Sequence, residues 1–384
     1  MIATRLFRAM ALAGAAAIAW SGLPAAQATE RRQPACGSLV TANVLLTADL
    51  VCSGDGLIVD GATGVTIDLG GFTLSGNGTG TGISIRQSTD VRVRHGSINT
   101  FFTAVSVASP ATLVDLRFSG NTGPPSGYFV ASDLIVTAPV VARRLTGTGS
   151  VFAAWHAGSV FNHVSFSLLF TRNASNIEIS NSAIYGMFAR DSFHLLLSDD
   201  VIHGAGVLQS DGLEFRDNEM TSLSVSQSRG TTVVNNVFRH GGVALNFNPY
   251  GTAANLIDGN LFEGNDVGVL LDNDGPTTTT VTNNRFPDNA SAGLYAISRR
   301  GTVAISGNIL NGNGLASTFV GRAGTLIDDG MHVVVMAGAS ATITGNTANR
   351  NADLGIQATD AIDGGANTAE RNRNPAQCIG VACA

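Results

Sequence analysis

Three side chains with acid–base or cationic character recur at one interval in the middle of the chain. Tyr185, His203 and Arg239 occupy positions that differ by 18 and by 36 residues, and Thr221 stands at the step between the last two. Histidine and tyrosine exchange protons in catalysis, and arginine neutralises a carboxylate. Proton abstraction beside the carboxylate of a uronic acid needs one base, one acid and one cation. We therefore predict Tyr185, His203 and Arg239 as catalytic residues.

Carboxylates and amides accompany this column at the same interval. Asp199 and Asp217 are 18 residues apart, Asp200 follows the first of them, and Gln209 and Gln227 are also 18 apart. Carboxylate oxygens are ligands of Ca²⁺, so Asp199 and Asp217 are predicted to hold Ca²⁺, the one cofactor that these residues suggest. Asp199, Asp200, Asp217, Gln209 and Gln227 are predicted to bind the substrate. The alternative is that both columns are hydrogen-bonded ladders that cap turns.

Paired acids open a second chemistry for the same residues. Two carboxyl groups that are roughly 5 to 10 Å apart hydrolyse glycosidic bonds. Elimination and hydrolysis therefore both stay open at this point, and so does a purely structural role.

A repeated phrase indicates the element that must position these side chains. It reads apolar, any, Asn/Asp/Gly, Asn or a substitute, any, apolar, and it runs from Ile179 to Ala348. Its fourth position falls at 182, 200, 218, 236, 260, 284, 308 and 346, so the steps are 18, 18, 18, 24, 24, 24 and 38. Such a period is typical of repeat architectures, and apolar residues around a polar turn indicate short strands. We predict an all-β parallel solenoid of about thirteen coils, in which equivalent residues stack.

The longest step contains an insertion from Ala316 to Asp329. Insertions in repeat proteins map to loops on one face, which is often the binding face. Asp328 and Asp329 end this insertion and could contribute from a lid, although loop acids are usually only solvated. Trp155 is expected in the core rather than as a platform for a sugar.

The two ends of the chain carry signs of export. Residues 1–28 read as a signal peptide, with Arg5 and Arg8 before an apolar run and a small-residue cleavage site at Ala28. In an oxidising compartment the four cysteines predict two local disulfides, one between Cys36 and Cys52 and one between Cys378 and Cys383. The predicted organisation is an N-terminal cap over 29–60, a β-helix over 61–360 and a C-terminal cap over 361–384.

The charge balance excludes some partners. The 384 residues carry a net charge of −6, only 13% of them are charged, and every basic residue is arginine. A mildly acidic chain without basic runs is a poor ligand for nucleic acid or an anionic membrane. We expect a monomer that binds no nucleic acid and, after removal of the signal, no membrane.

The period, the segment Ile67-Asp-Leu-Gly-Gly-Phe72 and the Gly-Asn-x-Phe/Leu turns resemble the right-handed parallel β-helix proteins of the pectin-lyase-like superfamily. The resemblance covers nearly all of the chain after residue 28 and implies the right-handed sense. Members include polysaccharide lyases, hydrolases, epimerases and noncatalytic binding proteins, so the fold alone does not give the activity. The catalytic blocks of the polygalacturonase-type enzymes are missing apart from Asp199-Asp200, and no catalytic residue is carried over.

Together these features predict a secreted protein that binds an acidic or plant/microbial polysaccharide, and they leave its cleavage by a lyase or hydrolase reaction open. The alternative is a noncatalytic surface, adhesive or carbohydrate-binding scaffold. The missing catalytic blocks favour that alternative, whereas the stacked Tyr, His and Arg favour chemistry.

Overall fold

The computed structural model describes residues 33–123 and 133–384. The predicted signal peptide over 1–28 lies outside these residues. Within the described part of the chain, no helix is long and apolar enough to cross a membrane.

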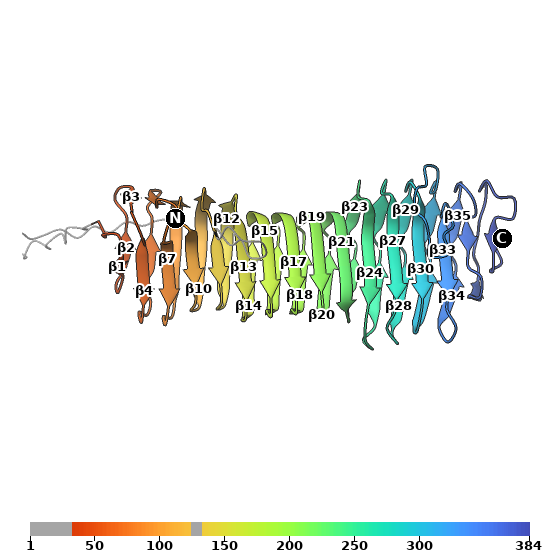
Figure 1. Ribbon diagram of the computed structural model, residues 1–384, viewed down its shortest axis with the longest axis horizontal. Coiled ribbons are helices and arrows are strands. Elements are labelled where there is room, and N and C mark those ends of the chain that lie inside the picture. Colours follow the sequence, from red (N-terminus) through yellow and green to blue (C-terminus); the bar gives the residue numbers. More distant parts are fainter. Residues whose placement is uncertain (1–32, 124–132) are drawn as a thin grey trace, which may run out of the picture. The chain divides into compact units, whose positions relative to one another are not determined.

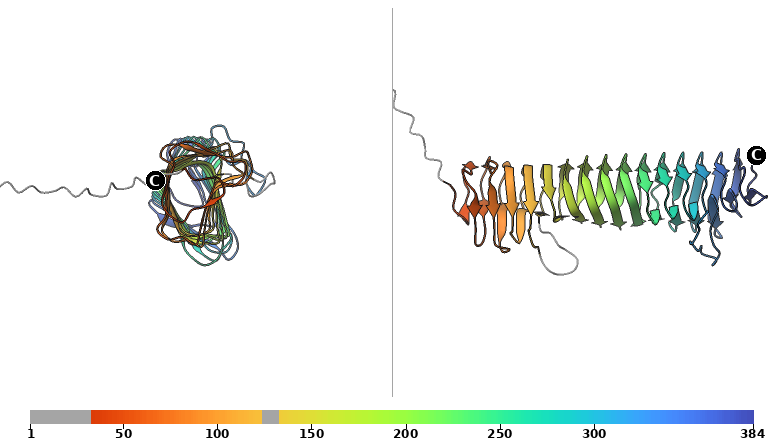
Figure 2. Two further views of the ribbon diagram at one scale, coloured as in Figure 1. Left: turned by 90° about the vertical axis from the view of Figure 1, so that its left-hand side faces the viewer. Right: turned by 90° about the horizontal axis from the view of Figure 1, so that it is seen from above.

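The described residues form a right-handed parallel β-solenoid of about 15 turns, with one strand of each sheet above the equivalent strand of the preceding turn (Figures 1 and 2). The turn count exceeds the thirteen predicted because the first and last turns lie in segments that the sequence suggested were caps. Ser38 already pairs with Leu57, and Ile356 pairs with Cys378. All-β architecture and right-handed coiling are confirmed.

Three sheets run along the solenoid. Sheet 1 consists of β1 (Ser38–Leu39), β4 (Leu57–Asp60), β7 (Thr81–Arg86), β9 (Thr103–Val107), β11 (Leu134–Val136), β13 (Ser150–Ala154), β15 (Ser165–Arg172), β17 (Ala183–Arg190), β19 (Val201–Leu208), β21 (Glu219–Ser228), β24 (Val243–Pro249), β27 (Val267–Asn273), β30 (Ala292–Ser298), β33 (Met331–Val335), β36 (Ile356–Gln357) and β38 (Cys378–Ile379). Sheet 2 consists of β2 (Val44–Leu45), β5 (Thr66–Asp68), β8 (Val91–Asn99), β10 (Ala111–Ser119), β12 (Val140–Gly147), β14 (Ala157–Asn162), β16 (Ser175–Ser180), β18 (Phe193–Ser198), β20 (Asp211–Arg216), β22 (Thr232–Val234), β25 (Asn255–Asp258), β28 (Thr278–Thr282), β31 (Thr302–Ser306), β34 (Ser340–Thr344) and β37 (Ile362–Gly365). Sheet 3 consists of β3 (Leu50–Val51), β6 (Thr73–Ser75), β23 (Val237–Arg239), β26 (Leu261–Glu263), β29 (Arg285–Pro287), β32 (Ile309–Asn311) and β35 (Thr347–Asn349), together with parts of the long strands that turn a corner, namely β8, β10, β12, β15, β17, β19 and β21.

Apolar side chains point into the solenoid at every second strand position and stack on their equivalents in the next turn. The rings of Phe238, Phe262 and Phe286 stack at centroid distances of 4.9 and 5.0 Å. Burial of these columns in a continuous core is the main force that holds neighbouring turns together, at roughly 25 cal/mol per Å² of apolar surface.

Buried amides form a second kind of column at the corner between sheets 2 and 3. The side-chain oxygen of Asn284 accepts hydrogen bonds from the backbone and side chain of Asn260, and its amide donates to Asn308 and to the carbonyl of Ile257. The same pattern recurs at Asn218, Asn236, Asn260, Asn308 and Asn346. The repeated Asn of the sequence phrase is therefore an interior ladder that satisfies turn backbone groups.

The two predicted disulfides are both present. Cys36–Cys52 joins the first turn to itself, and Cys378–Cys383 closes a short loop at the last turn. Each lies in a terminal turn of the described solenoid, where strand edges need protection from pairing with other chains.

Replacing Asn284 by alanine should destabilise the protein by about 3–5 kcal/mol, because several buried groups lose their partners at about 1–3 kcal/mol each. The Thr278→Ala variant in the same turn removes an exposed side chain and should stay within about 0.5 kcal/mol of the wild type. Urea unfolding followed by circular dichroism measures both. Equal midpoints for the two variants would contradict the structural role of the ladder.

Candidate functional site

The predicted catalytic column is only partly assembled. The rings of Tyr185 and His203 lie 4.9 Å apart, and 69% of Tyr185 is exposed. Arg239 lies two turns further on and donates a hydrogen bond of 2.7 Å to Glu263. Tyr185 and His203 are therefore neighbours on the surface, whereas Arg239 has a carboxylate partner of its own. The catalytic roles of the three residues stay a prediction.

The predicted binding residues Asp199, Asp217, Gln209 and Gln227 all lie at corners. Their backbone φ values are +58°, +56°, +52° and +51°, in the left-handed region that Asn and Asp adopt most easily among non-glycine residues. Their side chains are exposed. The left-handed corner explains the aspartates at 199 and 217, while saccharide or Ca²⁺ binding by the four side chains stays a prediction.

Asp200 needs a correction, because it cannot bind an external ligand as predicted. Asp200 is 1% exposed and belongs to the interior amide ladder. Asn218 occupies the equivalent position in the next turn and accepts the Asp200 N–H. One carboxylate oxygen accepts the N–H of Ser182 at 2.8 Å, and the other has no hydrogen-bond partner among the described residues. Burial raises the pKa of Asp200 to about 7.

The inserted segment 316–329 forms a loop over the outer face of sheet 1 (Figure 2, right, where it projects from the blue end of the solenoid). The loop is closed by a bridge between Val320 and Leu326 and by a hydrogen bond of 2.6 Å from the Ser317 hydroxyl to the Ile327 carbonyl. The backbone N–H of Arg322 donates to the Tyr295 hydroxyl at 2.8 Å, which ties the loop to β30.

A pocket of about 260 Å³ lies between this loop and strands β30 and β33. Its wall is largely apolar, and three of its side chains, those of Tyr295, Arg322 and His332, can exchange a proton or carry a positive charge. The lining residues are Tyr295, Arg322, Ala323, Thr325, Ile327, His332, Val334 and Met336. Apolar pockets with a few convergent polar groups are the usual form of a small-ligand site. The insertion predicted to mark the binding face thus forms one wall of a pocket.

Inside the pocket, His332 is held by a buried carboxylate. Its Nδ1 lies 2.7 Å from an Asp329 carboxylate oxygen, and the side chains of His332 and Asp329 are only 12% and 3% exposed. The other oxygen of Asp329 accepts the N–H of Leu354 at 3.1 Å. With Nδ1–H donating to Asp329, a neutral His332 keeps its lone pair on Nε2, and the carboxylate stabilises the imidazolium formed when Nε2 takes a proton.

Tyr295 lies beside this pair. Its ring centroid is 5.4 Å from that of His332, and the residue is 2% exposed. Burial raises the pKa of Tyr295, and the Asp272 carboxylate raises it further, while Arg299, which is paired with Asp272, acts in the opposite direction. The phenol therefore keeps its proton at neutral pH and can serve as an acid.

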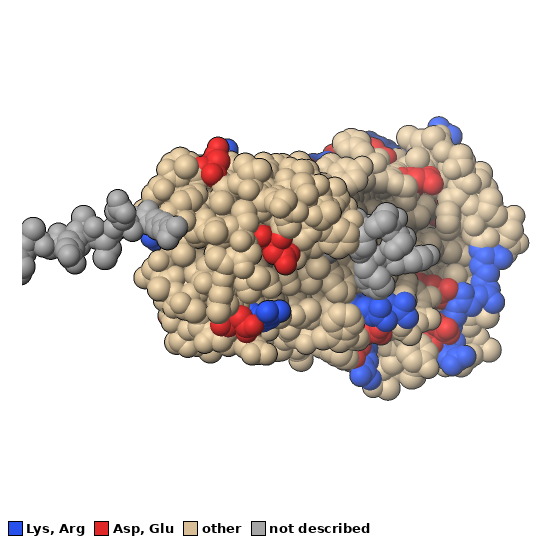
Figure 3. Space-filling model, turned by 60° about the vertical axis from the view of Figure 1, so that its left-hand side comes forward, with Lys and Arg blue, Asp and Glu red and all other residues tan. Residues whose placement is uncertain are grey.

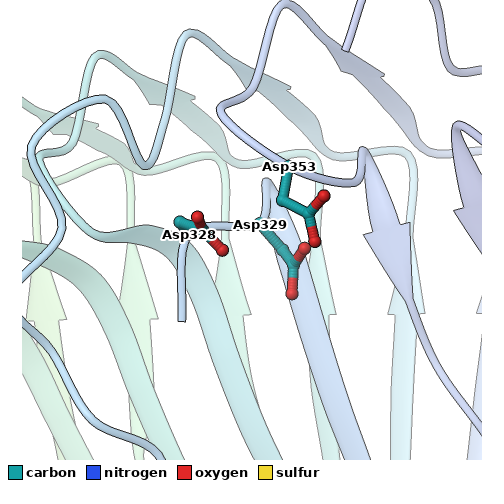
Figure 4. Close-up of side chains that lie close together, drawn as sticks. All are labelled: Asp328, Asp329 and Asp353. Atoms are coloured by element: carbon teal, nitrogen blue, oxygen red, sulfur yellow. The ribbon is translucent and has the colours of Figure 1, made fainter. Parts of the chain in front are cut away.

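Three carboxylates converge at the base of the loop (Figure 4). One carboxylate oxygen from each of Asp328, Asp329 and Asp353 lies within 4.8 Å of the other two. Carboxylate oxygens are typical ligands of Ca²⁺. His332, the Leu354 N–H and Asn374 already use oxygens of Asp329 and Asp353. Burial and the two neighbouring carboxylates raise the pKa of Asp328, so proton uptake can relieve the repulsion without a cation.

The sequence located the loop but not the residues beneath it. Tyr295 and His332 pair across adjacent strands although they are 37 residues apart, because the insertion separates them in sequence. Trp155 also differs from expectation, since 61% of it is exposed and its ring lies edge-on to Phe152 rather than in the core.

Residues 167–332 match the family described as right handed beta helix region. No curated protein matches the chain. A mutant of the periplasmic alginate epimerase AlgG is similar in structure with 10% identity over 90% of this chain and 78% of that one, at a TM-score of 0.37. An alginate lyase in a complex is also similar, with 12% identity over 91% of this chain and 83% of that one, at a TM-score of 0.32. The A-module of a mannuronan C-5 epimerase from Azotobacter vinelandii has 15% identity over 89% of this chain and 91% of that one, at a TM-score of 0.27. At these identities the function must be argued from the chain's own residues.

Proposed function

We propose that this protein binds an acidic polysaccharide and cleaves it by β-elimination, because its β-solenoid carries an acid–base pocket beneath the inserted loop. The observation that carries the proposal is the buried Asp329 carboxylate that holds His332 beside Tyr295. The proposal requires a base, an acid and a cation within reach of one uronate unit, and the pocket lining supplies one of each.

The proposed reaction needs no external oxidant or cofactor. Nε2 of His332 takes the C5 proton next to the uronate carboxylate, and the electrons of that C–H bond form a C4=C5 double bond as the C4–O bond breaks. The Tyr295 hydroxyl gives its proton to the departing oxygen. Arg322, which lines the pocket and is exposed, lies where it can pair with the uronate carboxylate.

Hydrolysis fits the pocket less well than elimination. Glycosidases place two carboxyl groups on either side of the scissile bond. The residues that line this pocket include no aspartate or glutamate. The Asp329 carboxylate points to His332 instead, which supports the role of an orienting group.

The rival proposal is a noncatalytic scaffold. The long solenoid with exposed Tyr185 and Trp155 offers aromatic surfaces on which a sugar could stack. In that case the protein would retain a saccharide without converting it.

The two proposals are separated by incubating the protein with polygalacturonate, polymannuronate, polyguluronate and a neutral glucan, each with and without Ca²⁺. Ultraviolet absorbance follows the unsaturated product, and a reducing-end assay follows hydrolysis. We expect absorbance to rise with one or more polyuronates and to stay flat with the neutral glucan. Measurable affinity without any new product would favour the scaffold.

We further propose that the protein works outside the cytoplasm. The two disulfides support an oxidising compartment, in which such bonds persist. The predicted signal peptide over 1–28 supports the same location.

A further inference from the structure

A second hollow lies far from the pocket, near the N-terminal end of the solenoid. It measures about 440 Å³ and is lined by Gly71, His95, Gly96, Ser97, Asp115, Leu116, Arg117, Arg144 and Thr146. These residues come from β8, β10 and β12 and from the turn after β5. About nine turns, or roughly 40 Å, separate it from Tyr295. In Figure 3, which brings the N-terminal end forward, basic and acidic side chains stand interspersed on the side of the solenoid, whereas the near end carries few.

A network of paired charges borders this hollow, and His95, Asp115 and Arg144 are its members that line the hollow. Arg144 donates two hydrogen bonds to Asp115, at 2.5 and 2.9 Å, and Arg94 donates one to Asp68 at 2.9 Å. His95 stands between the two carboxylates, with a ring nitrogen 3.5 Å from each. The Arg144 guanidinium holds the pKa of Asp115 below its usual value, so this carboxylate stays ionised. Each of the two carboxylates is therefore balanced by an arginine.

Three polar side chains from consecutive turns line the hollow in a row. Ser97 pairs with Arg117, and Arg117 pairs with Thr146, so the three positions are adjacent on sheet 3. Within residues 33–123 and 133–384, Arg117 is exposed and forms no ion pair. Its guanidinium is therefore flanked by two hydroxyl-bearing side chains at the strand spacing of about 4.8 Å.

The charges of the hollow do not cancel. Among the lining residues Arg144 offsets Asp115, and Arg94 offsets Asp68 next to the hollow. This leaves the positive charge of Arg117, on a protein whose total charge is negative. A guanidinium binds a carboxylate or sulfate through two parallel hydrogen bonds. Ser97 and Thr146 can donate to or accept from the hydroxyls of a sugar ring.

We propose that this hollow is a binding site for a saccharide unit that carries an oxyanion, with Arg117 on the oxyanion and Ser97 and Thr146 on its hydroxyls. The site is separate from the Tyr295–His332 pocket and binds without converting its ligand. It does not depend on the elimination reaction, because none of its residues takes part in that reaction. Carboxylated and sulfated sugars share the chemistry that it recognises.

The test measures binding of trigalacturonate by calorimetry, in an Arg322→Ala background that weakens binding at the other pocket. We expect Arg117→Ala to weaken the affinity by about tenfold or more, which corresponds to one charged hydrogen-bonded contact. The matched control is Arg143→Ala, which removes an exposed arginine of the neighbouring strand β12 that does not line the hollow. The affinity of this variant should equal that of the background.

Equal affinity of the Arg117→Ala variant and its background would overturn the proposal. Binding of neutral maltotriose as tightly as trigalacturonate would overturn it too, because the cation would then have no role. A sulfated disaccharide replaces trigalacturonate in a parallel titration. The ligand that binds more tightly shows whether the site prefers a carboxylate or a sulfate. Loss of polyuronate cleavage in His332→Ala with binding at the hollow retained would show that the two sites are independent.

Discussion

Replacing His332 with alanine is expected to lower the rate of polyuronate cleavage by about 10²- to 10⁴-fold, the usual contribution of a general base. The alanine leaves no group at the position of Nε2, so the C5 proton has no acceptor. Tyr295→Phe should cause a loss of similar order, because it removes the acidic hydroxyl and keeps the ring. Initial rates of absorbance increase at saturating polymer measure both variants.

Two further variants make this prediction specific. Asp329→Asn keeps the size of the side chain but removes the charge that stabilises the imidazolium, so it should lower the rate while thermal unfolding shows that the loop region stays folded. His240→Asn replaces an exposed histidine at a left-handed corner and should leave the rate unchanged. Full activity of His332→Ala together with a large loss in His203→Ala would contradict the pocket and favour the column of Tyr185, His203 and Arg239.

Replacing Asp200 with asparagine should stabilise the protein at pH 8 and remove one component of its pH dependence. The Asp200 pKa of about 7 is higher than the ordinary aspartate pKa of 3.8, which applies to the unfolded chain. For a raised pKa, the contribution to stability is fully present below pH 3.8 and is lost as the pH rises to about 7. The difference between these two pKa values corresponds to about 4 kcal/mol, at about 1.4 kcal/mol for each tenfold change.

The asparagine amide would restore the ladder at this position. Asn218 and Asn236 donate to carbonyls 21 residues earlier, at Leu197 and Phe215, and the equivalent acceptor for residue 200 is the Ile179 carbonyl. Unfolding midpoints between pH 4.5 and pH 8.5 test this, with Asp199→Asn as the exposed neighbouring control. If the unfolding midpoints of the wild type and Asp200→Asn changed with pH in the same way, ionisation of the buried Asp200 carboxylate would not lower the stability, and the prediction would be wrong.

The period of the sequence was enough to predict the solenoid, but it did not tell which of two adjacent aspartates turns inward. Strict alternation would place Leu197, Asp199 and Val201 on one side. The left-handed conformation of Asp199 breaks this alternation, so Leu197, Asp200 and Ile202 point inward instead. Backbone conformation at a corner depends on stacking against the next turn, and that information is not present in one repeat.

The pocket could be predicted only as a loop on one face. Residues 316–329 stand out as an insertion, yet nothing in the sequence places Arg322 against the Tyr295 hydroxyl or Asp329 against His332. These contacts arise because β30 and β33 are neighbours in sheet 1 and the loop folds back over both. Local patterns therefore predict the scaffold, whereas the acid–base group depends on contacts between residues far apart in sequence.

The equal turns from β16 to β21 have a consequence for how such a protein can change over generations. Duplication of one 18-residue unit would add a turn with matching strands and a matching ladder position, since each turn contacts only its neighbours. The added turn would move the Arg117 hollow and the Tyr295 pocket apart by about 4.8 Å, without altering either. Gain or loss of gene segments that each encode one turn can thus lengthen or shorten the distance between the two sites by whole turns. The turns between the sites act as a modular spacer.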